Sequence, residues 1–132
     1  MLLNTANTHH WVGRKPDPSK YFGFIYLITC KVTGRMYIGK KQYHIWQKRK
    51  IAKENNWHYY TGSSKDLNYD IKSMGKESFE FKILKNFNTR GGLSYGEVNL
   101  QHKKDVLTTA HPDGRLYYNK AIGAIRFIPK EF

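Results

Sequence analysis

Two apolar segments indicate the fold class most clearly: Phe22-Gly23-Phe24-Ile25-Tyr26-Leu27-Ile28 and the later Arg35-Met36-Tyr37-Ile38-Gly39. Along the first segment both the odd and the even positions are largely apolar, which predicts a central β-strand covered on two sides. Lys31-Val32-Thr33-Gly34 supplies a turn, and the second segment has the pattern of a short antiparallel partner. We therefore predict a β-hairpin from about Gly23 to Gly39.

Three helices and one more strand are predicted around this hairpin. Ile45 and Ala52 stand seven residues apart, which allows a first helix over roughly residues 45–55. Leu67, Ile71 and Met74 form an i, i+4, i+7 stripe that indicates a second helix, and Gly75 is placed to end it.

The remaining elements complete the predicted fold class. Alternation over residues 78–87 indicates a third strand, and a third helix is expected from about Leu93 to Val106. The expected fold is α+β, with a small three-stranded antiparallel sheet flanked by helices in the order ββααβα.

Length and composition bound the domain organisation. A chain of 132 residues is typical of one domain. We expect residues 1–20, with Pro16 and Pro18, to be a flexible N-terminal arm without a regular element, and residues 21–132 to form the domain.

The lone Cys30 excludes an internal disulfide and a Cys-based zinc site, which favours a reducing compartment. The sequence has no run of eighteen apolar residues and no secretory leader, so we expect no membrane association.

The charge indicates a polyanionic partner. There are 23 Lys and Arg against 10 Asp and Glu, which gives a formal charge of +13. Together with 15% aromatic residues, this excess favours nucleic acid, whereas a membrane surface requires a basic amphipathic helix. The chain between residues 40 and 53 is cationic and has no acid, so it is either a solvated face or a phosphate contact, and we favour the latter: Lys40, Lys41, Lys48, Arg49, Lys50 and Lys53.

Glu97 is unusual because it lies on an apolar stripe. It falls between Leu93 and Leu100 at helical spacing. A carboxylate in that position must be paired, protonated or bound to a cation. It is therefore either an ion-pair partner of a core-facing Lys or Arg or a metal ligand in a basic cleft. One carboxylate is chemically sufficient for Mg²⁺, which prefers oxygen ligands and keeps several waters.

Tyr26 and Tyr37 stand on adjacent strands of the predicted hairpin. They are either core residues with satisfied hydroxyl groups or phenols that project toward a shared site. A phenol titrates near pH 10, so it needs nearby cations or metal-bound water to act as a base.

Phe24-Ile25-Tyr26 followed by Tyr37-Ile38-Gly39 resembles the paired signature of the GIY-YIG endonuclease family, with Phe24 in place of the first glycine. Gly62-Ser63-Ser64, Glu97 and Tyr118-Asn119 follow in the family's order, so the resemblance covers most of the chain from Phe22 to Asn119. It is greatest to short phage-encoded members related to homing endonucleases.

The resemblance implies a DNA endonuclease that hydrolyses phosphodiester bonds with Mg²⁺ or Mn²⁺. Tyr26 and Tyr37 match the signature tyrosines, one of which helps to deprotonate the attacking water. Glu97 matches the metal-binding glutamate, and Asn119 matches a supporting asparagine. Gln47 stands where the family has a phosphate-binding arginine, so we assign that role to Arg49, with Lys48 and Lys41 as substitutes. The expected nucleic-acid contacts are Lys40, Lys48, Lys50, Lys53, His58, Tyr60 and Ser63.

The expected partner is double-stranded DNA, bound by a monomer or a homodimer, in the cytoplasm of a bacterial host if the chain is phage-encoded. One alternative is a catalytically weak or inactive nucleic-acid-binding module of the same fold. Another is an RNA-directed enzyme or an interaction protein that stacks partners on Trp46, Trp57 and Tyr59.

Overall fold

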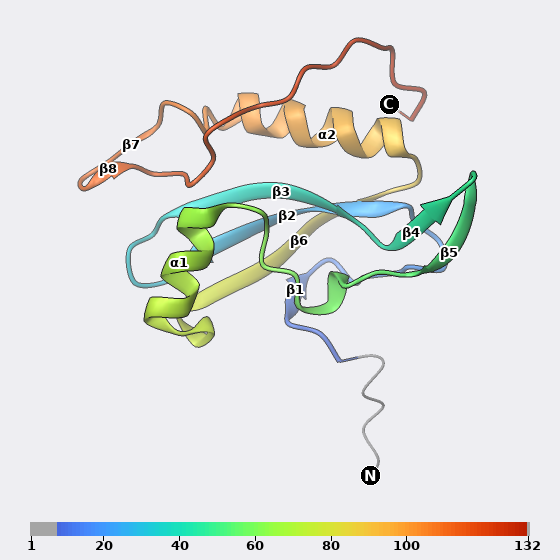
Figure 1. The fold of residues 1–132 in the computed structure, drawn as a ribbon. Helices are drawn as coiled ribbons and strands as arrows, with labels where there is room; N and C mark the ends of the chain where they lie inside the picture. Colours follow the sequence, from blue (N-terminus) through green and yellow to red (C-terminus); the bar gives the residue numbers. More distant parts are fainter. Residues whose placement is uncertain (1–7, 132) are drawn as a thin grey trace.

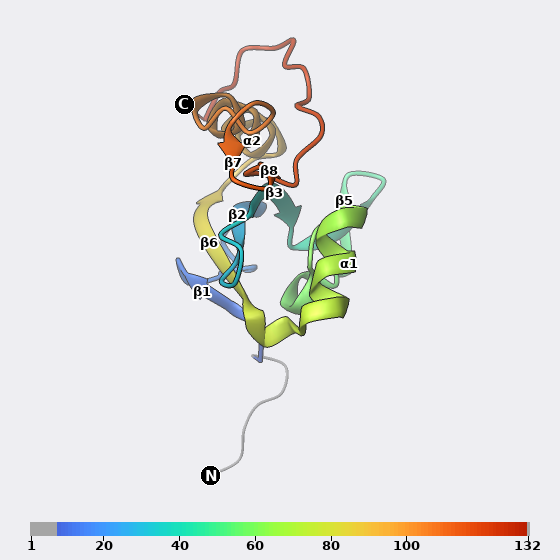
Figure 2. The ribbon, with the colours of Figure 1, turned by 90° about the vertical axis from the view of Figure 1, so that its left-hand side faces the viewer.

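A computed structural model of the protein describes residues 8–131, so residues 1–7 of the predicted arm lie outside the described part. The main sheet has four strands in the order β1-β6-β2-β3. Helices α1 and α2 lie on different sides of this sheet (Figures 1 and 2). The four strands are β1 (Trp11–Gly13), β2 (Gly23–Cys30), β3 (Met36–Gln42) and β6 (Phe79–Phe87).

The predicted hairpin is confirmed as β2 and β3. The two strands pair antiparallel, with Tyr26 opposite Gly39 and Tyr37 opposite Ile28. Strand β6 pairs antiparallel with the other edge of β2, which confirms the predicted third strand. Strand β2 is therefore central, as its two apolar faces indicated.

The expectation that residues 1–20 lack a regular element is wrong at β1. Residues Trp11–Gly13 pair with β6 in parallel, which makes the sheet four-stranded and mixed rather than three-stranded and antiparallel. The Trp11 side chain is 5% exposed and packs edge-on against Phe24, and its indole N–H donates to the Trp57 carbonyl over 2.7 Å. Burial of this large side chain holds the segment against the sheet.

Helix α1 (Lys65–Met74) confirms the predicted second helix. Its N-terminus is capped by the Ser64 hydroxyl, which accepts from the Leu67 amide, and Gly75 ends it with a φ of 91°. Helix α2 (Arg90–Lys103) begins and ends three residues before the predicted third helix. Its start is set by Thr89, which caps the N-terminus by accepting from the Gly92 amide.

The first predicted helix is wrong. Residues 45–55 belong instead to a two-stranded antiparallel sheet of β4 (His44–Gln47) and β5 (Lys50–Glu54). Trp46 pairs with Ile51 across the strands, and both residue types favour strands. The described residues contain two α-helices instead of the three predicted, so the predicted ββααβα order is wrong.

Short elements complete the fold. They are the 3₁₀ turns η2 (Trp57–Tyr59) and η3 (Lys76–Ser78) and the small strands β7 (Ala110–His111) and β8 (Gly114–Arg115). After β8 the chain returns along α2 toward that helix's N-terminus (Figure 1). None of the helices in residues 8–131 is long and apolar enough to cross a membrane.

Candidate active site

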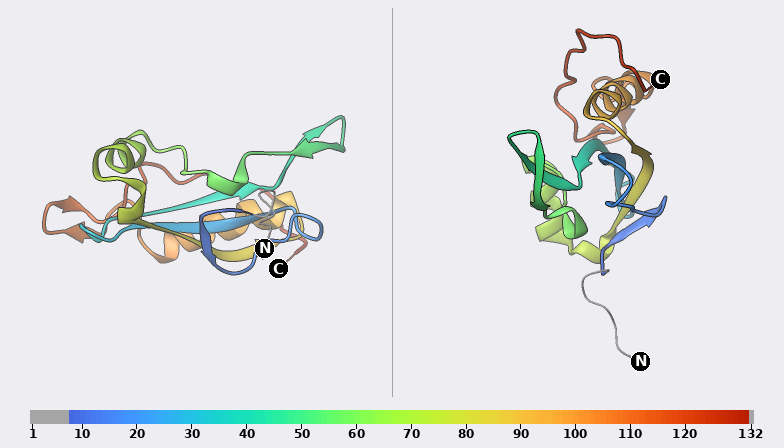
Figure 3. Two further views of the ribbon diagram at one scale, coloured as in Figure 1. Left: turned by 90° about the horizontal axis from the view of Figure 1, so that it is seen from below. Right: turned by 90° about the vertical axis from the view of Figure 1, so that its right-hand side faces the viewer.

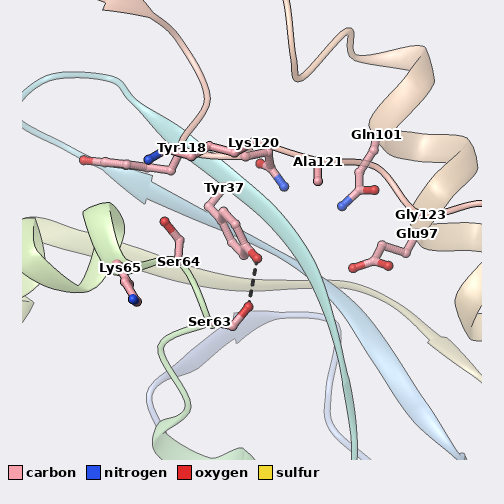
Figure 4. Close-up of a pocket in the computed structure, with 11 residues that line it drawn as sticks. Tyr37, Ser63, Ser64, Lys65, Glu97, Gln101, Tyr118, Lys120, Ala121 and Gly123 are labelled. Carbon is pink, nitrogen blue, oxygen red and sulfur yellow. Dashed lines mark hydrogen bonds between the residues drawn. The ribbon is translucent and has the colours of Figure 1, made fainter.

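A cleft of about 390 Å³ lies where β3, α2, the N-terminus of α1 and the C-terminal segment meet (Figure 4). Side chains from all four regions reach it, so its shape depends on how these regions pack together. Its lining residues include Tyr37, Ser63, Lys65, Glu97, Asn119 and Lys120.

Tyr26 lies behind the wall of this cleft. Its side chain is 1% exposed, and its ring packs on Gly39 of the neighbouring strand. A Cβ atom on Gly39 would lie 2.6 Å from Cζ of Tyr26, so only glycine leaves room for the ring. Burial raises the pKa of Tyr26 well above its ordinary value. Tyr26 therefore remains a neutral phenol, which disfavours a role as a base.

Tyr37 is the signature tyrosine that lines the cleft. Its ring centroid lies 6.2 Å from that of Tyr26, and its hydroxyl oxygen lies 3.3 Å from Oγ of Ser63. Figure 4 shows this contact at the edge of the open space. The two tyrosines are thus neighbours in different surroundings, one in the core and one at the surface of the cleft.

Glu97 projects from α2 into the same cleft (Figure 4). Its side chain is 18% exposed, and Oε1 lies 4.0 Å from Nζ of Lys40. Lys40 also donates to the Ser94 hydroxyl over 2.9 Å. Burial raises the pKa of Glu97 and attraction to Lys40 lowers it, and the net shift is upward. Lys40 therefore offsets only part of the cost of burying this carboxylate.

This incomplete compensation fits a bound divalent cation, because a second positive charge would favour the ionised carboxylate. Within residues 8–131, no group of three or more His, Cys, Asp or Glu side chains could hold a metal ion. A Mg²⁺ or Mn²⁺ ion would have Glu97 as its protein carboxylate, and water and phosphate oxygens would complete its shell.

Asn119 and Gln101 position the Tyr37–Gly39 backbone. The Ile38 amide donates to Oδ1 of Asn119 over 3.0 Å. The side-chain amides of Asn119 and Gln101 both donate to the Ile38 carbonyl, over 2.8 and 2.9 Å. Both side chains are buried, so Asn119 is part of the support for the cleft rather than a group free to contact a substrate. Gln101 was missed in the sequence, although it lies one helical turn after Glu97.

A second, basic pocket of about 280 Å³ lies beside Glu97, because Lys40, which pairs with the Glu97 carboxylate, also lines this pocket. Lys41 and Tyr60 line it, and Nζ of Lys41 lies 4.1 Å from the centre of the Tyr60 ring. Burial lowers the pKa of Lys41. Arg90, the first residue of α2, lines the same pocket and was also missed. No sequence signal marked Arg90, because it precedes the predicted start of the third helix at Leu93.

The other predicted contacts lie elsewhere. The assignment of Arg49 as the phosphate-binding arginine depended on a helix that is absent, and Arg49 is instead at the exposed turn between β4 and β5. Lys48, Lys50 and Lys53 are on the same exposed hairpin. His58 stacks on the Trp57 ring and faces the Glu54 carboxylate at 3.5 Å. None of these five residues lines the cleft.

The fold and the site define a class: a small α+β domain in which a hairpin tyrosine, a helix carboxylate and lysines share a cleft. A comparison with protein families agrees, since residues 4–122 match the family described as "Putative endonuclease segE, GIY-YIG domain". The chain belongs to this GIY-YIG endonuclease family. Neither the curated proteins nor the solved structures gave a match.

Proposed function

We propose that the protein is a divalent-metal-dependent DNA endonuclease that hydrolyses phosphodiester bonds, of the self-standing phage type. The observation that carries this proposal is the meeting of the Glu97 carboxylate and the Tyr37 hydroxyl in one cleft beside Lys40. Family membership and a formal charge of +13 support a nucleic-acid substrate. Duplex DNA is the proposed substrate, bound by a monomer or a homodimer.

The proposed chemistry divides among few residues. Tyr37, whose hydroxyl reaches the cleft, orients the attacking water and accepts its hydrogen bond, whereas the neutral phenol of Tyr26 packs behind it. Glu97 would hold the metal, and a bound Mg²⁺ supplies Lewis-acid stabilisation of the phosphate charge. Lys40, Lys41 and Arg90 provide positive charge for the phosphate from the adjoining basic pocket.

A plasmid assay tests this function. Supercoiled plasmid incubated with the protein and Mg²⁺ should be nicked or linearised, and chelation of the metal should stop the reaction. Glu97→Gln keeps the size of the side chain and removes its charge, so it should abolish cleavage while the protein still folds and binds DNA. Glu97→Ala should do the same. Cleavage by either variant at the wild-type rate would remove Glu97 from the mechanism.

An inactive binding module is the alternative favoured by two departures from the family pattern, which are Phe24 in place of the signature glycine and Gln47 in place of the arginine. The structure places Phe24 in the core, fully buried and 5.1 Å between ring centroids from both Trp11 and Tyr43. This departure from the family pattern therefore removes no side chain from the cleft. DNA binding without cleavage under Mg²⁺ or Mn²⁺ would establish the alternative.

A further inference from the structure

The β4–β5 hairpin is an outlying element. It forms a two-stranded sheet of its own, and every residue in it except His44 is exposed. Figures 1 and 3 show it projecting from the end of the main sheet opposite α1. A hairpin this exposed adds little to the core, so its length and charge point to a role outside folding.

The two faces of the hairpin differ in chemistry. His44, Trp46 and Ile51 line a hollow against residues 18–22 of the body, and the Trp46 ring lies 5.9 Å from that of Phe22. Directly paired residues share a face, so the pairs Gln47–Lys50 and Ile45–Lys53 occupy the other side. The side turned away from the body therefore carries two lysines and no acid.

The tip of the hairpin carries two more cations, Lys48 and Arg49, in a strained backbone conformation. Lys48 and Arg49 both have positive φ angles, 51° and 65°. A two-residue turn of this kind favours Asn-Gly, because glycine has no Cβ and the short polar side chain of asparagine tolerates the left-handed region, whereas longer side chains are strained there. The chain thus keeps two cations where folding favours small residues, and this indicates a ligand of negative charge.

The base of the hairpin is fixed to the body beside the basic pocket. Tyr43 is buried at the junction, and the Asn55 amide donates to its carbonyl over 2.9 Å. The Asn55 side chain also donates to the Gln42 carbonyl over 2.7 Å. Lys40 and Lys41 come immediately before this junction in β3 and line the basic pocket. Positive charge therefore continues along the chain from the pocket beside Glu97 to the hairpin.

We propose that the β4–β5 hairpin is a DNA-binding ribbon that enters the major groove of a duplex whose phosphate backbone crosses the cleft. The proposal rests on the duplex-DNA substrate proposed above. A two-stranded ribbon fits a groove about 12 Å wide, and lysines at its rim reach the flanking phosphates. Single-strand binding instead relies on rows of exposed aromatic side chains, and Trp46 of this hairpin lies on the face turned toward the body.

The double variant Lys48→Asn/Arg49→Gly tests the ribbon. It removes two charges and supplies the residues that the turn favours, so the protein should fold at least as stably as the wild type. Binding to a 30-base-pair duplex is measured without divalent ions and in a Glu97→Gln background, where no cleavage occurs. Affinity should fall about tenfold at physiological salt, and the slope of log K against log[salt] should become shallower by about 1.8.

The matched control is Lys31→Gln/Lys72→Gln. These exposed lysines lie at the opposite end of the sheet, after β2 and on α1, and their removal lowers the net charge equally (Figure 1). The control should bind nearly as tightly as the parent. An equal loss of affinity in the control and in the hairpin variant would reduce the effect to net charge and overturn the ribbon.

A crosslink locates the contact. Cys30 is buried, so Gln47→Cys, on the outward face of the hairpin, and Lys31→Cys each supply one exposed thiol for a photo-crosslinker. Crosslinking to duplex DNA from position 47, and not from position 31, supports the ribbon. Preferential crosslinking to single-stranded DNA or to RNA overturns it. A wild-type protein that binds the duplex but never cleaves it overturns the proposed nuclease alone, whereas a hairpin variant with unchanged affinity overturns the ribbon alone.

Discussion

The cleft and the β4–β5 hairpin present polar side chains in opposite settings. Around the cleft, buried groups fix the backbone, as in the hydrogen bonds from Asn119 and Gln101 to Ile38 and the contact of Tyr26 with Gly39. Beyond its base the hairpin contacts the rest of the protein through the Trp46 ring near Phe22, and its cations are exposed. Chemistry requires groups held in place, whereas phosphate contact requires charge within reach. The difference therefore separates a region suited to reaction from one suited to capture.

Loss of cleavage in Glu97→Gln is the strongest of the effects that we predict. We expect the cleavage rate of bound DNA to fall on the order of 10³-fold, because a preorganised charge at the reacting phosphate is removed. Affinity for the duplex should stay the same or rise slightly, since one negative charge is lost. Single-turnover cleavage and equilibrium binding measure the two quantities separately. A parallel fall in both would show that Glu97 contributes to binding as well as to reaction, and would contradict the division between the two regions.

Gly39→Ala tests the rigidity of the cleft wall. The added Cβ would overlap the Tyr26 ring, so we expect a loss of about 3 kcal/mol in the free energy of unfolding, near the upper end for overpacked cores. Urea denaturation provides the measurement. Gly123→Ala is the control, because a Cβ there meets its nearest atom at 3.9 Å, and it should change stability little. Equal stability of both variants would show that the ring of Tyr26 can move aside.

Asn119→Ala tests the support of β3. It leaves the buried Ile38 amide without its acceptor, which should cost about 2 kcal/mol of unfolding free energy. Gln47→Ala on the exposed hairpin should cost less than about 0.5 kcal/mol. Thermal unfolding of the two variants compares the regions directly, and similar shifts would mean that the cleft is no better supported than the hairpin.

The smallest expected effect is a pH-dependent gain in stability from Glu97→Gln. Because the folded-state pKa of Glu97 is raised, the folded protein binds this proton more tightly than the unfolded chain, and stability falls as pH rises through the raised pKa. The variant should therefore be slightly more stable than the wild type at pH 7, and this advantage should shrink toward pH 4. Mg²⁺ should raise the melting temperature of the wild type more than that of the variant. A stability advantage of the variant that grows as pH falls would contradict the upward pKa shift of Glu97.

The sequence predicted the parts of the molecule that depend on local pattern. The β2–β3 hairpin follows from the apolar pattern of its strands and the turn residues between them, and α1 follows from its stripe and Gly75. Residues 45–55 were predicted wrongly because the helix rested on the single spacing of seven between Ile45 and Ala52, and cross-strand pairs such as Trp46 with Ile51 decided the outcome.

Long-range contacts could not be predicted from pattern. Trp11 joins the sheet through contacts with residues far along the chain, and the bond from Gln101 to Ile38 spans 63 positions. In the cleft, Glu97 was identified by its place on an apolar stripe and Tyr37 by the hairpin signature. Arg90 was missed because its relevance follows from the position of α2 over Lys40 and Lys41 rather than from a motif.

The most direct test measures single-turnover cleavage of duplex DNA with Mg²⁺ and protein in saturating excess, so that every duplex is bound. We expect that Lys48→Asn/Arg49→Gly cuts at close to the wild-type rate, whereas Glu97→Gln leaves the DNA intact over the same time. Cleavage by Glu97→Gln at the wild-type rate, or an equal loss in both variants, would contradict the assignment of reaction to the cleft and of capture to the hairpin.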